Sequence, residues 1–440
     1  MENPLAERKL SPSETILWLI DQECRLNFVM HARVTGAVPE GVLRRALRAV
    51  QARHPLLRVR IEQGAWNRVW FRAGGVPELP LRVVAGPGPG WIEEAEQELQ
   101  EPLPAQQGPL ARCTLVRHGV KDQTVLLAFH HAIGDAISGS FLMRDLFRAA
   151  ALAAEGSPCE LPALAPKRET NAYFPDWALG LRGRWRSLRF AGRMLGATLR
   201  HGRPAVPRFD EKAPPRKRRA RIVPRRLDPA WIRRLHERAQ AEGTTLHGAL
   251  LAAQILAVAR DRGDAGARLY LTGSPVNLRK RLNPPVEEDV GFFVTVGASL
   301  NLVEPETPFW PLAIAARRSL WNCVERGEPF VYGVQHRDLC RMNALLGRRA
   351  VARVAESWAF GGLTLSNIGR VPLEDLPGPF IIEDLGFAAS LSCLSPLAAF
   401  AATTERRSTW NFVGMEPLLT KAHTEKIADS ALKILSAAVD

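Results

Sequence analysis

Short apolar runs alternate with amphipathic stretches along the first 165 residues. Residues 39–53 have apolar side chains at helical spacing on one face, and Ser11-Pro12-Ser13-Glu14 offers a helix start. The run 124–129 is short, apolar and preceded by a polar turn, as is typical of a buried strand. The pattern predicts helices at 39–53 and 137–151 and strands at 28–34, 57–62, 69–72, 110–117 and 124–131.

The same alternation starts again near residue 228. Helical patterns at 228–242 and 246–260 come first, and Thr244 is the expected cap of the second helix. Strands are predicted at 269–276, 290–302, 363–366, 398–404 and 409–412, and helices at 308–324 and 424–439. No sequence repeat relates the halves. A chain of 440 residues has room for two such cores. The pattern therefore indicates an α/β protein with two lobes, residues 1–165 and 227–440, separated by residues 166–226.

The segment between the lobes differs in charge from the rest of the chain. Residues 167–226 contain 18 Lys and Arg against four Asp and Glu, which accounts for the whole formal net charge of +14. Residues 177–200 mix arginines with apolar residues at helical spacing, which predicts a basic amphipathic helix. Residues 202–226 are rich in Pro and Arg and predict an extended crossover.

A basic helix of this kind has several uses. It can lie on an anionic membrane surface, dock an acidic carrier protein or bind nucleic acid, and it can also be only a solvated linker. No nucleic-acid motif accompanies the run, so we expect no nucleic-acid partner.

The cysteines and the chain start bear on the compartment. The six cysteines are scattered, with no CxxC or Cys/His ligand spacing, so we expect neither a metal site nor a disulfide framework. The N-terminus is polar, and the longest apolar run, 249–259, is too short to span a bilayer. We expect a cytoplasmic protein, with peripheral membrane association left open.

One short stretch, Phe129–Gly139 (FHHAIGDAISG), indicates a chemistry. His130 and His131 come at the carboxyl end of the predicted strand 124–131, where α/β folds place their active sites. An imidazole there can take a proton near neutral pH. The alternative is a strand end with one buried, hydrogen-bonded histidine.

The stretch resembles the HHxxxD signature of the chloramphenicol-acetyltransferase-like superfamily. Its members include nonribosomal peptide condensation domains, wax ester synthases and polyketide-associated acyltransferases. Four further pieces resemble family motifs in the same order: Arg53–Arg58 (RHPLLR), Ser274–Arg279 (SPVNLR), Gly291–Phe293 (GFF) and Ser366–Arg370 (SNIGR). The chain departs from the pattern at Ala136, where condensation domains usually have Gly, and it lacks the DFGWG motif of the plant acyltransferases.

The resemblance implies a fold and a site. The fold would be two chloramphenicol-acetyltransferase-like subdomains with mixed sheets, forming a pseudo-dimer around a central tunnel. The catalytic set would be His131 as general base, with His130 turned into the core and Asp135 on the turn after the strand. Asp135 would form an ion pair with Arg279 of the other lobe. Candidates for binding the oxyanion or acceptor are the backbone near Gly134, and Ser366 or Asn367 of the SNxG turn.

The function that follows is acyl transfer. An acyl group would move from a CoA or carrier-protein thioester to a hydroxyl, giving an ester, with the thioester as donor substrate and no further cofactor. A free-standing condensation enzyme that forms an amide is the alternative, because His131 would serve either nucleophile. The SNxG turn favours the ester. A non-catalytic binding relative of the same fold is a third reading, which the intact set of His131, Asp135 and Arg279 opposes.

Overall fold

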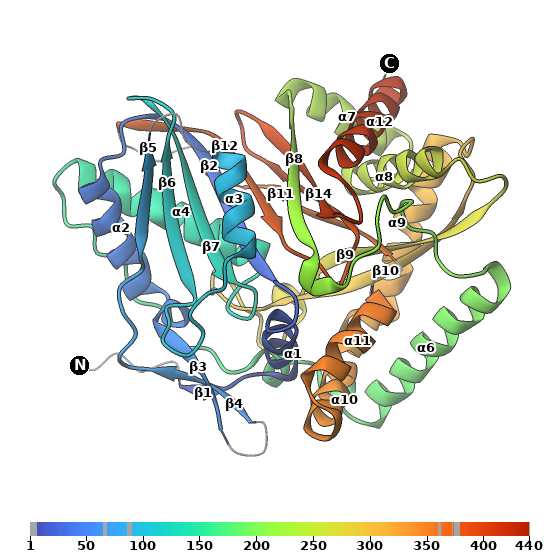
Figure 1. The fold of residues 1–440 in the computed structure, drawn as a ribbon, viewed down its shortest axis with the longest axis horizontal. Helices are drawn as coiled ribbons and strands as arrows, with labels where there is room; N and C mark the ends of the chain where they lie inside the picture. The colour runs from blue at the N-terminus through green and yellow to red at the C-terminus, as the bar shows by residue number, and fades with distance from the viewer. Residues whose placement is uncertain are drawn as a thin grey trace.

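The strands of the described residues form three sheets, and the two large ones stand side by side with helices around them (Figure 1). The computed structural model describes residues 7–64, 68–85, 90–359, 362–371, 373 and 379–439. Both large sheets contain parallel and antiparallel neighbours. The predicted α/β class with mixed sheets is therefore confirmed.

The five-stranded sheet carries the histidine motif at one strand end. Its order is β12 (Phe380–Ala389), β2 (Asn27–Gly36), β7 (Asp122–His130), β6 (Ala111–Arg117) and β5 (Leu81–Ala85). The helices α2 (Glu40–Arg53) and α4 (Ala136–Ala154) pack on each other on one face, and α3 (Trp91–Gln100) covers the other. Successive residues of β2 contact the helices on the two faces of this sheet. Met30 lies against Gly139 of α4, and His31 lies against Trp91 of α3.

The six-stranded sheet is buried on both faces at its inner strand β13. Its order is β10 (Val294–Val303), β9 (Arg268–Asn277), β11 (Gly362–Arg370), β13 (Leu397–Thr403), β14 (Ser408–Glu416) and β8 (Arg219–Leu227). Leu397, Ala399 and Ala401 of β13 pack into the core of the C-terminal helices. The alternate residues Ala398, Phe400 and Ala402 pack into the core of the five-stranded sheet. The helices that pack in the C-terminal core are α7 (Pro229–Ala241), α8 (Leu246–Arg262), α9 (Phe309–Glu325) and α12 (Lys421–Val439).

A group of helices closes the lower edge of both sheets in Figure 1. It contains α1 (Pro12–Asp21), α5 (Asp176–Leu179), α6 (Leu181–His201), α10 (Val331–Leu346) and α11 (Arg348–Ala359). The predicted start of α1 is a capping box, in which Ser11 Oγ accepts from Glu14 N and the Glu14 carboxylate accepts from Ser11 N. A small sheet of β1 (Arg8–Lys9), β4 (Val69–Ala73) and β3 (Val59–Gln63) lies beside this group.

The RHPLLR piece ties α2 to α4. His54 Nε2 lies 3.0 Å from Asp145 Oδ2, and Arg53 Nε donates to the same oxygen at 2.7 Å. His54 and Asp145 are both buried, and these contacts hold the pKa of Asp145 at about 2 against the effect of burial. A buried carboxylate that is paired in this way fixes the direction of α4, which begins at the histidine motif.

Some elements differ from the prediction. Residues 219–227, expected as part of the crossover, form β8 and pair with β14. The side-chain cap of α8 comes from Thr245, not Thr244, and β10 begins at Val294, not at residue 290. The strands β5 and β12 and the helices α3, α10 and α11 were not predicted at all.

The unpredicted strand β12 joins the two lobes. It comes from the C-terminal half of the sequence but pairs antiparallel with β2 of the five-stranded sheet. Asn411 of β14 donates to His31 Nε2 and to Phe387 O, both at 2.9 Å. Gly386 lies at this seam, and a Cβ there would overlap the His31 ring and lie 2.8 Å from Thr409 Oγ1.

We expect Gly386→Ala to destabilise the protein by about 1–3 kcal/mol, because the added methyl group must displace His31 or push the sheets apart. Urea unfolding measures the effect. Gly119→Ala is the control, since a Cβ there meets nothing within 4 Å. Equal stability of the two variants would show that the seam is not closely packed.

Candidate active site

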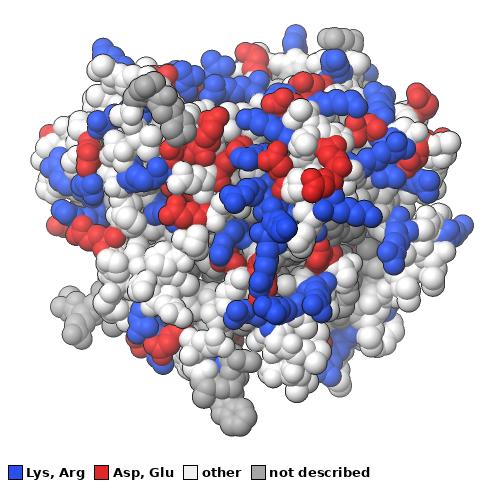
Figure 2. All heavy atoms as spheres, viewed as in Figure 1, with Lys and Arg blue, Asp and Glu red and all other residues white. Residues whose placement is uncertain are grey.

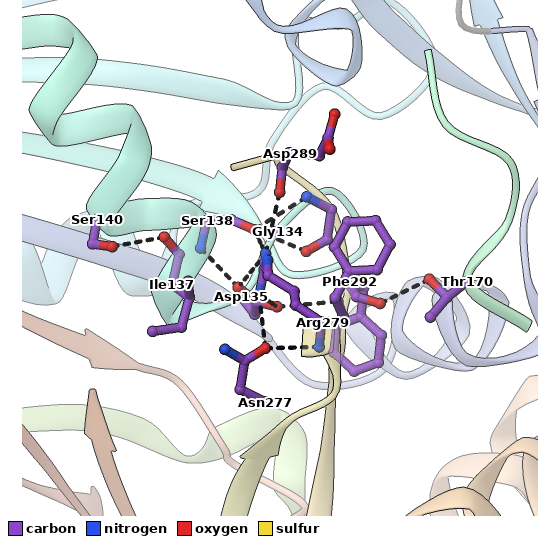
Figure 3. A network of polar contacts seen from close by, with 12 residues as sticks. Gly134, Asp135, Ile137, Ser138, Ser140, Thr170, Asn277, Arg279, Asp289 and Phe292 are labelled. Atoms are coloured by element: carbon purple, nitrogen blue, oxygen red, sulfur yellow. Dashed lines mark hydrogen bonds and ion pairs between the residues drawn. The ribbon is translucent and has the colours of Figure 1, made fainter. Parts of the chain in front are cut away.

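The histidine motif lies where the two lobes meet. His130 ends β7, His131 lies on the turn, and Asp135 is the N-cap of α4. The C-terminal lobe contributes the end of β9, the 3-10 turn Arg279–Arg281 and the segment 291–293. Figure 3 shows Asp135 and Ser138 on one side and Arg279 and Asn277 on the other, with their polar groups directed toward each other.

His131 is held in one tautomer by its own turn. Its Nδ1 lies 2.8 Å from the carbonyl oxygen of Gly134, which can only accept, so Nδ1 carries the proton and Nε2 has a free lone pair. The ring packs against Phe28 and Phe292, at centroid distances of 5.4 and 5.3 Å. Burial lowers the pKa of His131, and the Gly134 carbonyl and the Asp135 carboxylate oppose this only in part. The ring is half-buried, and its neutral form is a base at neutral pH.

His130 is turned away into the core. Its Nδ1 accepts from Ala132 N at 3.0 Å, so Nε2 carries the proton. Nε2 lies 3.7 Å from Asp21 Oδ2 of α1. The residue is 1 % exposed, and burial lowers the pKa of its imidazole. His130 is therefore turned into the core, as the resemblance implied, and its place in the catalytic set stays a prediction.

Asp135 and Arg279 form the expected ion pair between the lobes. The Arg279 nitrogens Nη1 and Nη2 lie 3.0 and 3.1 Å from Asp135 Oδ2 and Oδ1, and both side chains are only 3 % exposed. The carboxylate also accepts from Ser138 N at 2.7 Å and from Phe293 N at 3.0 Å. It therefore caps α4 and fixes the segment that carries Phe292. Asp135 does not contact the imidazole directly.

Two residues complete this network without having been predicted. Ser138 Oγ accepts from Arg279 Nη2 at 2.8 Å and donates to Gly291 O at 2.8 Å. Asn277 Oδ1 accepts from the backbone N of Arg279 at 3.0 Å. Asn277 lies in the SPVNLR piece and Ser138 one helical turn after Asp135. Neither serine nor asparagine indicates a site by itself. The only signal in the sequence for these two residues was therefore their position beside motif residues.

The other candidates lie in different places. Gly134 contributes its carbonyl to His131, and the role of the nearby backbone N–H groups stays a prediction. Ser366 and Asn367 are neighbours on β11, so their side chains point to opposite faces. Asn367 lines a pocket with Leu250 and Trp410 of the C-terminal core, and its Oδ1 accepts from Gly369 N. Asn367 therefore does not face His131, and of these two residues only Ser366 lies on the face toward the other lobe.

The tunnel stays a prediction. One surface pocket, lined by Val38, Arg117, His118 and Gln123 among others, lies at the opposite end of β7 from His131. Among the described residues, no group of three or more His, Cys, Asp or Glu could hold a metal ion. Among the helices that the structure describes, none is long and apolar enough to span a membrane.

The two mixed sheets and the HHxxxD turn facing Arg279 define a chloramphenicol-acetyltransferase-like protein. Polyketide synthase associated protein 5 from Mycobacterium tuberculosis superposes with a TM-score of 0.68 at 17% identity, covering 98% of each chain. The TRI3 trichothecene 15-O-acetyltransferase from Fusarium sporotrichioides gives 0.72 at 13% identity, over 98% of this chain and 95% of that one. The first condensation domain of the calcium-dependent antibiotic synthetase gives 0.73 at 17%, over 99% and 96%. At these identities the likeness shows the fold, and the fold prediction is confirmed.

Within this class, the chain belongs to the condensation-domain family, which residues 21–315 match. Residues 216–415 match the family "Phthiocerol/phthiodiolone dimycocerosyl transferase C-terminus". The chain is similar to the phosphinothricin tripeptide synthetases PhsC and PhsB of Streptomyces viridochromogenes, at 28% identity over 342 residues and 26% over 450. The matches cover 73% and 96% of this chain but 30% and 35% of the relatives, so the chain spans about a third of their length. Members of the family are acyltransferases or condensation enzymes.

We expect Asp135→Asn and Arg279→Gln each to lower the free energy of unfolding by about 3–5 kcal/mol, because each leaves the opposite charge buried and unpaired. Asparagine is also a good N-cap residue, so Asp135→Asn removes the negative charge but keeps the cap of α4. Urea unfolding of both single variants and the double variant measures their coupling.

The exposed pair Arg48–Glu78, with side chains 60% and 66% accessible, is the control cycle. There we expect a coupling of about 0–1 kcal/mol. Additive effects at Asp135 and Arg279 would show that the ion pair does not join the lobes.

Proposed function

We propose that the protein is an acyltransferase that moves an acyl group from a CoA or carrier-protein thioester to a hydroxyl, with His131 as general base. The orientation of His131 is the observation that carries this proposal. Its Nδ1 proton is bound to Gly134 O, its pKa is lowered and its side chain is half-buried. A neutral imidazole with a fixed, free Nε2 is what proton abstraction from an acceptor needs.

The reaction needs no covalent intermediate on the protein. As the hydroxyl oxygen bonds to the thioester carbonyl carbon, Nε2 takes the hydroxyl proton. The C–S bond then breaks, and the leaving thiolate takes the proton from Nε2, which gives an ester and a free thiol. The developing oxyanion requires a donor, for which the backbone near Gly134 and the Ser366 hydroxyl are candidates.

An ester product is favoured by one part of the chain. The SNIGR piece, which lies on β11, is within residues 216–415, which match the dimycocerosyl transferase C-terminus. The fold is shared with a protein whose name states O-acetyl transfer. Amide formation is the second candidate, since relatives such as PhsC are tripeptide synthetases and His131 could serve an amine equally well.

The donor and acceptor can be identified by mass spectrometry of products from a panel of acyl-CoAs and acyl carrier proteins with pooled alcohols and amines. An ester whose formation requires His131 supports the proposal. Amide products alone would favour the condensation reading. A folded protein that consumes no thioester with any acceptor would favour a non-catalytic binding relative.

We expect His131→Ala to reduce the transfer rate by about 10²–10⁴-fold, the usual contribution of a positioned general base. Its melting temperature should stay close to that of the wild type, because the ring is half-buried and acts on a proton. His130→Ala is the comparison and should lose stability together with activity, since His130 is buried between Ala132 and Asp21. A His131→Ala variant that keeps more than about a tenth of the rate would contradict the assignment.

The pH profile should follow the neutral form of His131. Its pKa lies below the ordinary value of about 6.5 because of burial, and only the unprotonated ring acts as a base. With an alcohol acceptor, kcat/KM should be constant near neutral pH and fall about tenfold per pH unit below an apparent pKa under 6.5. Returning samples to neutral pH controls for unfolding. An acid limb centred above 6.5 would disagree with the burial of the ring.

A further inference from the structure

Helix α6 exposes a stripe of large apolar side chains along its whole length. Their exposed fractions run from 58% at Trp185 to 86% at Leu181, and the stripe consists of Leu181, Trp185, Leu188, Leu195 and Leu199. Steps of three, four and seven residues keep all of them on one side of a helix. The helix has 21 residues and is about 30 Å long. A contiguous exposed stripe of this kind marks an interaction surface.

Arginines lie on both sides of the stripe. At 100° per residue, Arg182, Arg189 and Arg200 follow one side and Arg184 lies on the other. All four are exposed, and α6 contains no Asp or Glu. Figure 2 shows basic and uncharged side chains at the place of α6, lower right, whereas acidic and basic groups intermingle over the upper part of the same face.

The opposite face of α6 is fixed to the lobe. Arg193 Nη2 donates to Glu328 at 2.6 Å, and Phe190 packs on Tyr332 with ring centroids 6.2 Å apart. The guanidinium of Arg186 lies 3.9 Å from the centre of the Trp177 ring. These contacts hold the helix in its rotation about its axis, so the apolar stripe cannot turn inward without breaking them.

We propose that α6 binds the surface of an anionic lipid bilayer and lies in its interface. The apolar stripe would enter the acyl-chain boundary, and the flanking arginines would contact lipid phosphates. A second copy of this chain fits poorly, because pairing two stripes brings arginine rows of the same sign together. A folded acidic protein would match the arginines but must also offer an apolar groove about 30 Å long. This proposal goes beyond acyl transfer and does not depend on it.

Flotation of the full-length protein with vesicles tests the proposal. The vesicles contain phosphatidylcholine alone or phosphatidylcholine mixed with phosphatidylglycerol. We expect binding to the mixed vesicles that weakens as salt is added, since screening acts over about 8–10 Å, and much weaker binding to phosphatidylcholine.

Two variants separate the apolar and the charged contributions. Replacing Trp185, Leu188 and Leu195 by Gln removes the stripe, and Val120→Gln with Ile381→Gln is the control, at exposed apolar positions of the other lobe. Replacing the four flanking arginines by Gln removes the charge. Its control replaces four exposed arginines elsewhere: Arg148, Arg233, Arg234 and Arg318. Arg186 stays unchanged because it stacks on Trp177.

We expect the arginine variant to lower the vesicle partition coefficient at least about tenfold, since each surface arginine contributes about fivefold. The stripe variant should also lower it at least about tenfold, because binding strength scales with the apolar area that enters the bilayer. Both controls should bind like the wild type. Circular dichroism should show all variants folded, because every changed side chain is exposed. Equal loss in an α6 variant and its control would overturn the proposal. So would stripe-dependent dimerisation in sedimentation velocity, or stripe-dependent binding to an acidic carrier protein without vesicle binding.

Discussion

The buried contact between Asp135 and Arg279 is the constraint on which the rest of the site depends. Each group would be costly to bury alone, and each finds its partner only when the lobes are docked. The same carboxylate caps α4 and accepts from Phe293 N, next to the Phe292 ring that packs on His131. One ionised side chain thus fixes the start of a helix, a loop of the other lobe and one wall around the base. The site is therefore complete only when the two lobes are docked.

The sequence identified three ionisable members of the site because they lie in pieces whose residues and spacing match known motifs. His131, Asp135 and Arg279 lie where that resemblance placed them, although 144 residues separate the two charges. Ser138 and Phe28 were missed, since serine and phenylalanine are common and only the folded contact distinguishes them. Asn367 lies on the face of β11 that packs into the C-terminal core, and Ser366 on the opposite face. The motif alone does not tell which of these neighbouring residues faces the other lobe.

Periodicity located most long helices and central strands, but not the elements whose partners are distant in sequence. β12 pairs with β2 across the lobes, and its apolar pattern carries no information about that partner. β8 was missed because its Pro- and Arg-rich composition is typical of a loop. As an edge strand it tolerates Pro224, which faces Asn411 of β14. Its arginines are held by ion pairs such as Arg221–Glu96 and Arg225–Asp429.

These ion pairs divide the basic segment into two parts with different physics. In β8 three arginines pair with carboxylates of α3, α12 and β12, so their charge belongs to the internal structure. In α6 only Arg193 has a carboxylate partner among the contacts described, on the inner face of the helix. The exposed arginines of α6 flank apolar side chains instead.

Net charge alone, counted over residues 167–226, could not separate these cases. The separation follows from which side chains each arginine faces. That helix follows Thr170, whose hydroxyl donates to the carbonyl oxygen of Phe292. Residues 171–180 therefore join the basic helix α6 to a residue that contacts the Phe292 backbone, next to His131.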